Sequence, residues 1–487
     1  MNKSLIAIAL FSIGFISHAE PVKVFAHYMT CFTGSEEFCK REIALAHRYG
    51  LDGFALNCGE WKKLDEKGNI IDTNYVRNAD LMFKAAKEDG RDFKLFFSPD
   101  FAGKMIKTLP DINLGDMVKR YYEHPNAFRY KGKYFLSGYA GMRLDYDSPA
   151  RKLRNEGYEF YLVPTSSFKQ YPMALSWEKI LAQFPPEGQY DGLFRFTCDG
   201  TAQDLLKVNA LLRRATMHLD KIYMAGLCPA YNSPNLRDYA GMKGYISMWE
   251  GLIRDGADMV EIVTWNDYNE DSNIMAYAVR YASGKRCFDR DESYLDVTRY
   301  FSNFYKNKNR PAVTQDKVYL TYRTHLKEQT KAWDEKDQKW DDARFNLNSH
   351  QIQMHDDVLD LVNVTAFLTA PGTIEIRQGS KVETFERPAG IVFAEAALLP
   401  GETPHVRLLR GKAALIDFTG RRMVVKNPTP VNSIQGRNSL LYRTWTNGAV
   451  AGKPAYSFDL KERSLKENNE EIILPVSSPG EKTYSFL

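Results

Sequence analysis

Short apolar runs alternate with amphipathic stretches along the chain from residue 22 to about residue 315. Eight of these runs are almost continuously apolar, which is typical of parallel strands that are buried on both faces. They cover residues 22–29, 53–59, 93–101, 134–141, 159–167, 192–199, 221–229 and 259–267. The stretches between them have helical spacing, as residues 36–50 and 78–90 illustrate, and Gly90 is a typical helix stop.

This pattern predicts an α/β fold in which a (β/α)8 TIM barrel is followed by a C-terminal β-sandwich-like domain. Eight strand–helix units match a TIM barrel, which usually occupies about 250 residues. A doubly wound open sheet is the alternative, but no glycine-rich phosphate loop follows the first run. After the eighth unit the chain changes to short alternating runs separated by Gly and Pro, as in a sandwich. We therefore expect a barrel over residues 20–315 and a β-rich domain over residues 316–487.

Polar residues recur where the predicted strands end. In chain order they are His27, Asn57, Asp100, Tyr139, Thr165, Asp199 and Tyr231, followed by Asp267 and Glu270. In a barrel the carboxyl ends of all strands surround one mouth, where this fold builds its active sites. Any one of these residues could cap a helix or lie in solvent, but their recurrence predicts a common site. We expect those before the acid pair, apart from Thr165, to contact substrate.

The eighth run ends in two carboxylates three residues apart, Asp267 and Glu270, in the sequence EIVTWNDYNED. Two carboxyl groups are the minimum for hydrolysis of a glycosidic bond. One gives a proton to the leaving oxygen, and the other, ionised, activates water or attacks the sugar. The sequence therefore predicts a catalytic pair, although the spacing does not separate inversion from retention.

Three neighbours of this pair bear on its chemistry. We expect Trp265 and Asn266 at the rim of the site, in contact with substrate. A wall formed by Trp265 would raise the pKa of a carboxyl, and Asn266 could hydrogen-bond a sugar hydroxyl. The negative charge of Asp271 would also favour a protonated neighbour. The alternative is that Asp267 or Asp271 caps the next element.

Composition narrows the possible partners. With 13% aromatic residues, the chain can supply rings for a sugar site as well as for a core. The formal net charge is +4 without a run of five basic residues, so we expect neither nucleic acid nor an anionic membrane as a partner. No zinc spacing and no EF-hand loop occurs, so we expect no metal and no cofactor. We expect a monomer that acts on a polysaccharide or oligosaccharide.

The N-terminus, residues 1–19, has the features of a secretory signal peptide. Lys3 precedes an apolar run over residues 5–16, and the small residues Ser17 and Ala19 fit cleavage after Ala19. The run is shorter than the roughly 20 residues that span a bilayer. We therefore expect a secreted or periplasmic protein without a membrane span.

Export would permit disulfides among the six cysteines of the chain. Cys31 and Cys39 are the best local pair, because a bond between them would close a short loop. The full pairing stays open.

These motifs resemble glycoside hydrolase family 71, the α-1,3-glucanases or mutanases, over roughly residues 22–420. The segments that carry the resemblance are VFAHYM (24–29), GLDGFALNCG (50–59), FKLFFSPDF (93–101), HPNAFRYKGKYFLSGYAG (124–141), VEIVTWNDYNED (260–271), SYLDVTRYFSNFYKNKNRPAV (293–313) and VYLTYRTH (318–325). The resemblance implies inverting hydrolysis of α-1,3-glucan or a related α-glycan by Asp267 and Glu270. The related family 99 endo-mannosidases also place two acids three residues apart after a Trp-Asn pair. That analogy implies Glu270 as the general acid and Asp267 as the base.

The chain departs from the family pattern at two places. Asn269 stands where the family usually has Gly, and Asp271, Ser272 and Asn273 replace a Ser-His-Tyr sequence. The fourth run ends in GYAG (138–141) where the family tends to have Phe-Glu-Gly. Two further hypotheses therefore stay open: a family 99-like hydrolase acting on mannan or another glycan, and a glycan-binding barrel that has lost catalysis.

We expect the C-terminal region to pack on the barrel and stabilise it.

Overall fold

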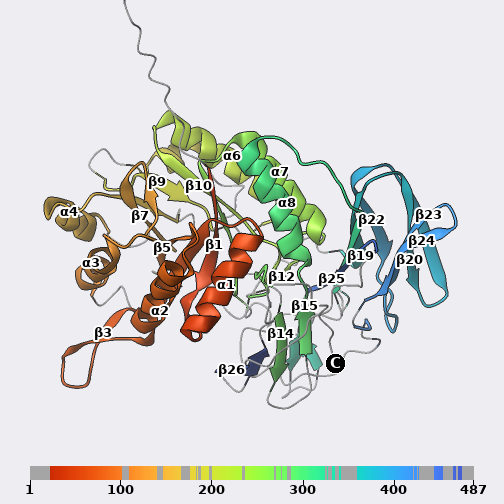
Figure 1. Ribbon diagram of the computed structural model, residues 1–487, viewed down its shortest axis with the longest axis horizontal. Coiled ribbons are helices and arrows are strands. Elements are labelled where there is room, and N and C mark those ends of the chain that lie inside the picture. The colour runs from red at the N-terminus through yellow and green to blue at the C-terminus, as the bar shows by residue number, and fades with distance from the viewer. Residues whose placement is uncertain are drawn as a thin grey trace, which may run out of the picture.

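The structure is a computed structural model with a mixed α/β part and a β-rich part (Figure 1). It describes residues 22–100, 109–139, 146–165, 176–182, 184, 188–196, 200–232, 236–267, 270–275, 277–281, 287–323, 326, 332–334, 339–341, 359–420, 422–424, 426, 444–452, 464–467 and 470–473. The predicted signal peptide, residues 1–19, lies outside this set. No helix within these ranges is long and apolar enough to cross a membrane.

Among the described residues, eight parallel strands form a curled central sheet, and each begins within one residue of a predicted run. They are β1 (Lys23–Met29), β2 (Gly53–Cys58), β5 (Lys94–Pro99), β7 (Lys133–Gly138), β8 (Phe160–Pro164), β9 (Gly192–Phe194), β10 (Ile222–Leu227) and β13 (Met259–Ile262). Their order is β8-β7-β5-β2-β1-β13-β10-β9, so the first strand pairs with both the second and the eighth. An isolated bridge between Thr165 and Phe194 connects the ends of β8 and β9.

A helix follows each of these strands in the chain, as the sequence pattern predicts. The helices are α1 (Glu36–Arg48), α2 (Asn74–Asp89), α3 (Pro110–Tyr121), α4 (Asp147–Asn155), α5 (Trp177–Leu181), α6 (Ala202–His218), α7 (Met242–Asp255) and α8 (Ser293–Asn307), with a short 3-10 turn, η1 (Thr30–Phe32), before α1. The predicted stop at Gly90 is confirmed, because this residue ends α2 in the left-handed conformation that favours glycine.

Strand side chains divide into two packed layers, because successive residues point to opposite faces of a sheet. Phe25, Phe96 and Phe135 belong to the layer inside the curl, where the rings of Phe25 and Phe96 meet edge to face at 4.9 Å. Val24 and Phe54 belong to the larger layer between the sheet and the helices. Both layers are closely packed, so the strand ends are held rigidly.

The β-rich part contains an eight-stranded and a four-stranded sheet. The first has the order β22 (Gly390–Ala397), β19 (Leu361–Leu368), β16 (Lys317–Arg323), β25 (Thr444–Val450), β15 (Cys287–Arg290), β14 (Tyr277–Tyr281), β27 (Glu470–Ile473) and β26 (Ser464–Glu467). The second has the order β21 (Lys381–Arg387), β20 (Gly372–Gln378), β23 (His405–Arg410) and β24 (Ala413–Thr419). Strands β14 and β15 come from the segment before α8, yet they pair with the C-terminal strands.

Short strands complete the described elements. They are β3 (Lys62–Leu64), β4 (Ile70–Asp72), β6 (Arg129–Tyr130), β11 (Tyr231–Asn232), β12 (Leu236–Arg237), β17 (Ala332–Asp334) and β18 (Lys339–Asp341). Of these, β6 extends the central sheet as an antiparallel neighbour of β7. The others form two-stranded hairpins.

Ion pairs attach the eight-stranded sheet to the α/β part. Arg323 on β16 is 2% exposed, and its guanidinium contacts Asp238, before α7, at 3.1 Å and Asp360 at 2.6 Å. Lys317 at the other end of β16 pairs with Asp296 of α8 at 2.7 Å. The sheet is therefore fixed to the connections around α7 and α8.

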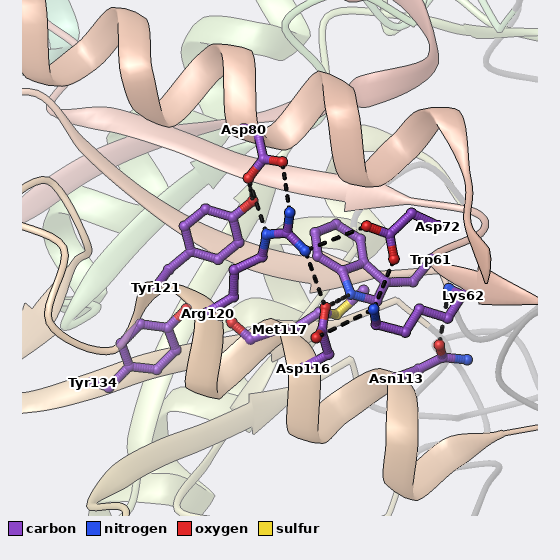
Figure 2. Close-up of polar contacts among 10 residues, drawn as sticks. All are labelled: Trp61, Lys62, Asp72, Asp80, Asn113, Asp116, Met117, Arg120, Tyr121 and Tyr134. Atoms are coloured by element: carbon purple, nitrogen blue, oxygen red, sulfur yellow. Dashed lines mark hydrogen bonds and ion pairs between the residues drawn. The ribbon is translucent and has the colours of Figure 1, made fainter. Parts of the chain in front are cut away.

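The β3–β4 hairpin follows β2 and is anchored at its base to α2 and α3 (Figure 2). Trp61 is fully buried, and its indole N–H donates to Asp116 of α3 at 2.8 Å. Arg120, which is one-third exposed, contacts Asp80 of α2 at 2.9 Å. The buried indole should stabilise this corner more than the exposed ion pair does.

We expect Trp61→Phe to lower the free energy of unfolding by about 1–3 kcal/mol, because it removes buried ring surface and a donor to Asp116. Arg120→Lys should lower it by less than about 1 kcal/mol, because solvent screens the ion pair. Urea unfolding followed by far-UV circular dichroism measures both changes. Equal losses in the two variants would contradict this ranking.

Candidate active site

Several predicted site residues lie together at the carboxyl ends of the parallel strands, which is one end of the curled sheet. Asp100 and Tyr139 form a parallel bridge beyond β5 and β7. The ring of Phe196, after β9, lies 4.6 Å from that of Tyr139 and 5.2 Å from that of His27. Tyr231 begins β11 beyond β10 and is half-buried. Asp199 lies outside the described residues.

His27 and Asn57 form the floor of this region together with Glu261, a residue that the sequence analysis did not select. His27 Nδ1 donates to Glu261 Oε1 at 2.6 Å, and its Nε2 accepts from the Asn57 amide at 3.0 Å. All three side chains are buried. Within the described part of the chain, the second oxygen of Glu261 has no hydrogen-bond partner. The sequence signal that could have identified Glu261 is a single Glu within an apolar strand, because a buried carboxyl requires a hydrogen-bonding or charged partner.

A hydrogen bond joins the two predicted acids in the segment after β13, whose described residues 264–267 and 270–275 we call the acid turn. Asp267 is 6% exposed, and its backbone N–H donates to Thr264 Oγ1 at 2.8 Å. The backbone N–H of Glu270 donates to Asp267 Oδ1 at 3.3 Å, and Glu270 itself is half-buried. The Asp267 carboxylate thus accepts from an N–H three residues on, as a cap does. This contact ties the backbone of one acid to the side chain of the other.

Trp265 and Asn266 hold this turn against β1. The backbone N–H of Trp265 donates to His27 O at 2.7 Å, and its indole N–H donates to Glu42 of α1 at 2.5 Å. The fully buried ring packs on Phe54 at 5.1 Å, so it lies in the layer under the helices and away from the predicted rim position.

Asn266 is 1% exposed, and its amide is occupied by the backbone of Met29. Its Oδ1 accepts from Met29 N–H at 2.7 Å, and its Nδ2 donates to Met29 O at 3.3 Å. In this arrangement the amide fixes the turn to the end of β1.

Asp271 is buried and paired with Arg290, at 2.8 Å between Oδ1 and Nη2. Its Oδ2 accepts from the N–H of Thr444 at 3.0 Å and from the Thr444 hydroxyl at 3.1 Å. Arg290 therefore balances the negative charge of Asp271, a pairing that the sequence alone did not predict.

The other residues that depart from the family pattern are also buried. Ser272 Oγ lies 3.2 Å from Thr264 Oγ1, and the amide of Asn273 donates to Met275 O at 2.7 Å. Both side chains are inaccessible to solvent. These two residues therefore support the turn from the protein interior. Residues 140 and 141 and Asn269 lie outside the described set.

Two further expectations concern metals and disulfides. Searching the described residues finds no group of three or more His, Cys, Asp or Glu side chains that could hold a metal ion. Cys31 and Cys39 do not form the disulfide that their spacing suggested.

The buried Glu261 predicts a pH-dependent contribution to stability. Burial raises the pKa of its carboxyl above the ordinary value of 4.5, while the hydrogen bond and charge of His27 act in the opposite direction. The native state therefore binds this proton more tightly than the unfolded state does. The resulting stabilisation is present below the ordinary pKa and is lost as the pH rises through the raised one.

We expect Glu261→Gln to remove this contribution, so the Tm of the wild type should fall relative to that of the variant as the pH rises above the ordinary pKa of 4.5. The matched control is Glu250→Gln, which changes an exposed carboxyl on α7. Scanning calorimetry across this pH range measures the difference. Parallel curves for the wild type and Glu261→Gln would contradict the burial effect.

The chain is similar to a known protein family and to individual proteins. The profile of Glycosyl hydrolase family 71 matches residues 20–451. Glucan endo-1,3-alpha-glucosidase agn1 of Schizosaccharomyces pombe is 25% identical over 407 residues, which is 79% of this chain and 86% of that protein. Mutanase Pc12g07500 of Penicillium rubens is 24% identical over 400 residues, or 78% of this chain and 81% of that protein.

Among solved structures, the GH99 endo-alpha-mannosidase from Bacteroides thetaiotaomicron is similar with a TM-score of 0.47 at 16% identity. The similarity covers 58% of this chain and 98% of that one.

Proposed function

The chain belongs to glycosyl hydrolase family 71, and from this membership we propose that it is an exported, endo-acting hydrolase of α-1,3-glucan or a related α-glycan. Family membership makes it a glycoside hydrolase. The names of both relatives, an endo-1,3-alpha-glucosidase and a mutanase, support α-1,3-glucan as the substrate. The signal-peptide pattern of residues 1–19 supports export.

We propose Asp267 and Glu270 as the catalytic pair, and the observation that carries this is their shared turn at the carboxyl end of β13. Protonated Glu270 gives its proton to the glycosidic oxygen as the bond to the anomeric carbon breaks. Ionised Asp267 takes a proton from a water that attacks the anomeric carbon on the opposite face. The product sugar then has the inverted configuration.

We propose that the neighbouring strand ends supply the substrate contacts. Tyr139 and Phe196 present adjacent rings that can pack against the C–H faces of a sugar. Asp100 beside Tyr139 can accept hydrogen bonds from hydroxyls. Tyr231 and Asp199 keep their predicted role as contacts from the neighbouring strand ends, with the floor of His27 and Asn57 beneath.

We also propose the finer description of the fold. Pairing of β1 with both β2 and β13, and the bridge between Thr165 and Phe194, support a closed (β/α)8 barrel. The two sheets of the β-rich part support a sandwich-like domain over residues 316–487, to which β14 and β15 add strands. We keep the expectation of a monomer.

A polysaccharide screen tests the substrate. We expect the wild-type enzyme to release reducing ends from α-1,3-glucan and not from α-mannan. Release from mannan alone would favour the family 99-like hypothesis. Binding to glucan without turnover would favour the non-catalytic barrel.

We expect Glu270→Gln to lower kcat on α-1,3-glucan by about 10²–10⁴-fold, because the amide has no proton to give to the leaving oxygen. Asp267→Asn should cause a similar loss, because the amide cannot accept a proton from water. The control Glu250→Gln changes an exposed carboxyl on α7 and should leave kcat unchanged. Reducing-end release measures all three, and near-normal activity of Glu270→Gln would rule out its assignment.

A further inference from the structure

The turn that carries Glu270 is bonded directly to the β-rich part of the protein. Asp271 follows Glu270 in the chain, and its carboxylate contacts Arg290 on β15 and Thr444 on β25. We propose that Arg290 and Thr444 are positioning residues that fix Asp271 and, through it, the orientation of the general acid. This inference rests on the proposed role of Glu270. It makes the eight-stranded sheet part of the active-site framework.

Both oxygens of the Asp271 carboxylate are engaged from that sheet. Arg290 Nη2 donates to Oδ1 at 2.8 Å, while the Thr444 N–H and hydroxyl donate to Oδ2 at 3.0 and 3.1 Å. Arg290 Nη2 also donates to Thr444 Oγ1 at 2.9 Å, so the hydroxyl is donor and acceptor at once. Arg290 and Asp271 are each 1% exposed and Thr444 is 5% exposed. Because the three side chains are buried, removing Arg290 would leave the charge of Asp271 uncompensated, and removing the Thr444 hydroxyl would take away one of its hydrogen bonds.

The backbone gives a reason for this network. Asp271 has a φ of +55°, in the left-handed region that residues other than glycine adopt uncommonly. Arg290 also donates to the main-chain carbonyls of Asp271, at 3.4 Å, and of Asn273. The guanidinium therefore holds the backbone on both sides of Asp271 in the conformation that the turn requires.

Glu270 is thereby held from two directions. On its N-terminal side, its own N–H donates to Asp267 Oδ1 at 3.3 Å. On its C-terminal side, the next residue is bonded to β15 and β25. A shift of Asp271 would rotate the backbone that aims the Glu270 carboxyl. Misplacement of a catalytic group by about 1 Å can cost about 100-fold in rate.

The strands that supply these contacts are themselves tied to the α/β part. Arg290 pairs with Thr446 across β15 and β25, and β25 pairs along its whole length with β16. Asp291, just before α8, accepts from Gly448 N–H of β25 at 2.8 Å. Strand β25 is therefore bonded to the segment that leads into α8 as well as to the acid turn, which suits a positioning role.

The sharpest test compares two substitutions of Thr444 that differ in the hydroxyl. Thr444→Val removes the donor to Asp271 Oδ2 while keeping the shape and the backbone N–H, whereas Thr444→Ser keeps the hydroxyl. We expect Thr444→Val to lower kcat on α-1,3-glucan oligosaccharides by about 10–100-fold with KM changed less than about 3-fold. Thr444→Ser should restore kcat to within about 3-fold of the wild type.

The matched control is Thr365→Val, which makes the same change at a buried position on β19 of the same sheet. Thr365 pairs with Tyr319 and Phe393. This variant should keep the wild-type kcat even if its Tm falls. If Thr444→Val does not fold, Arg290→Lys is the second variant. It retains the charge, loses the forked donors, and should show the same selective loss of kcat.

Two results would overturn the proposal. One is a wild-type kcat in folded Thr444→Val, in an enzyme that Glu270→Gln inactivates, which would reject the positioning role while leaving the proposed function intact. The other is an equal loss of kcat in Thr365→Val, which would make the effect one of general stability. An active Glu270→Gln enzyme would instead reject the assignment of Glu270 and this inference with it.

Discussion

Pairing of β1 with β13 is the constraint on which the candidate site depends. It places the end of the eighth strand beside the first, so residues more than two hundred positions apart become neighbours. The contacts of His27 with Glu261 and Trp265, and of Asn266 with Met29, all follow from this register. Without this pairing the acid turn would have no fixed position relative to the other strand ends.

The acid turn is stabilised by groups from three directions. Asn266 connects it to the central sheet, and Trp265 buries its ring under α1, while Thr264 accepts a hydrogen bond within the turn. Asp271 connects it to the eight-stranded sheet through Arg290 and Thr444. Buried hydrogen-bonded groups of this kind cost free energy unless every partner is present, so the surroundings determine one conformation of the turn. The acids can then be partly accessible and still well oriented.

The sequence predicted the regular elements well, because continuous apolar runs and helical spacing report burial directly. It predicted that polar residues collect at strand ends, but not their contacts. Trp265 and Asn266 have the chemistry of sugar ligands, and only the register of β13 against β1 shows that they are occupied inside the fold. The pairing of β15 with β25 joins distant segments and has no local signal, so the partner of Asp271 could not be predicted.

The anomeric configuration of the first product tests the central claim most directly, because it reports what the two acids do together. Proton NMR of the anomeric region, recorded within the first turnovers on an α-1,3-glucan oligosaccharide, distinguishes the product anomers before they equilibrate in water. If Asp267 activates water on the face opposite the leaving group, the β-anomer appears first and the α-anomer follows by mutarotation. Initial formation of the α-anomer would contradict the account.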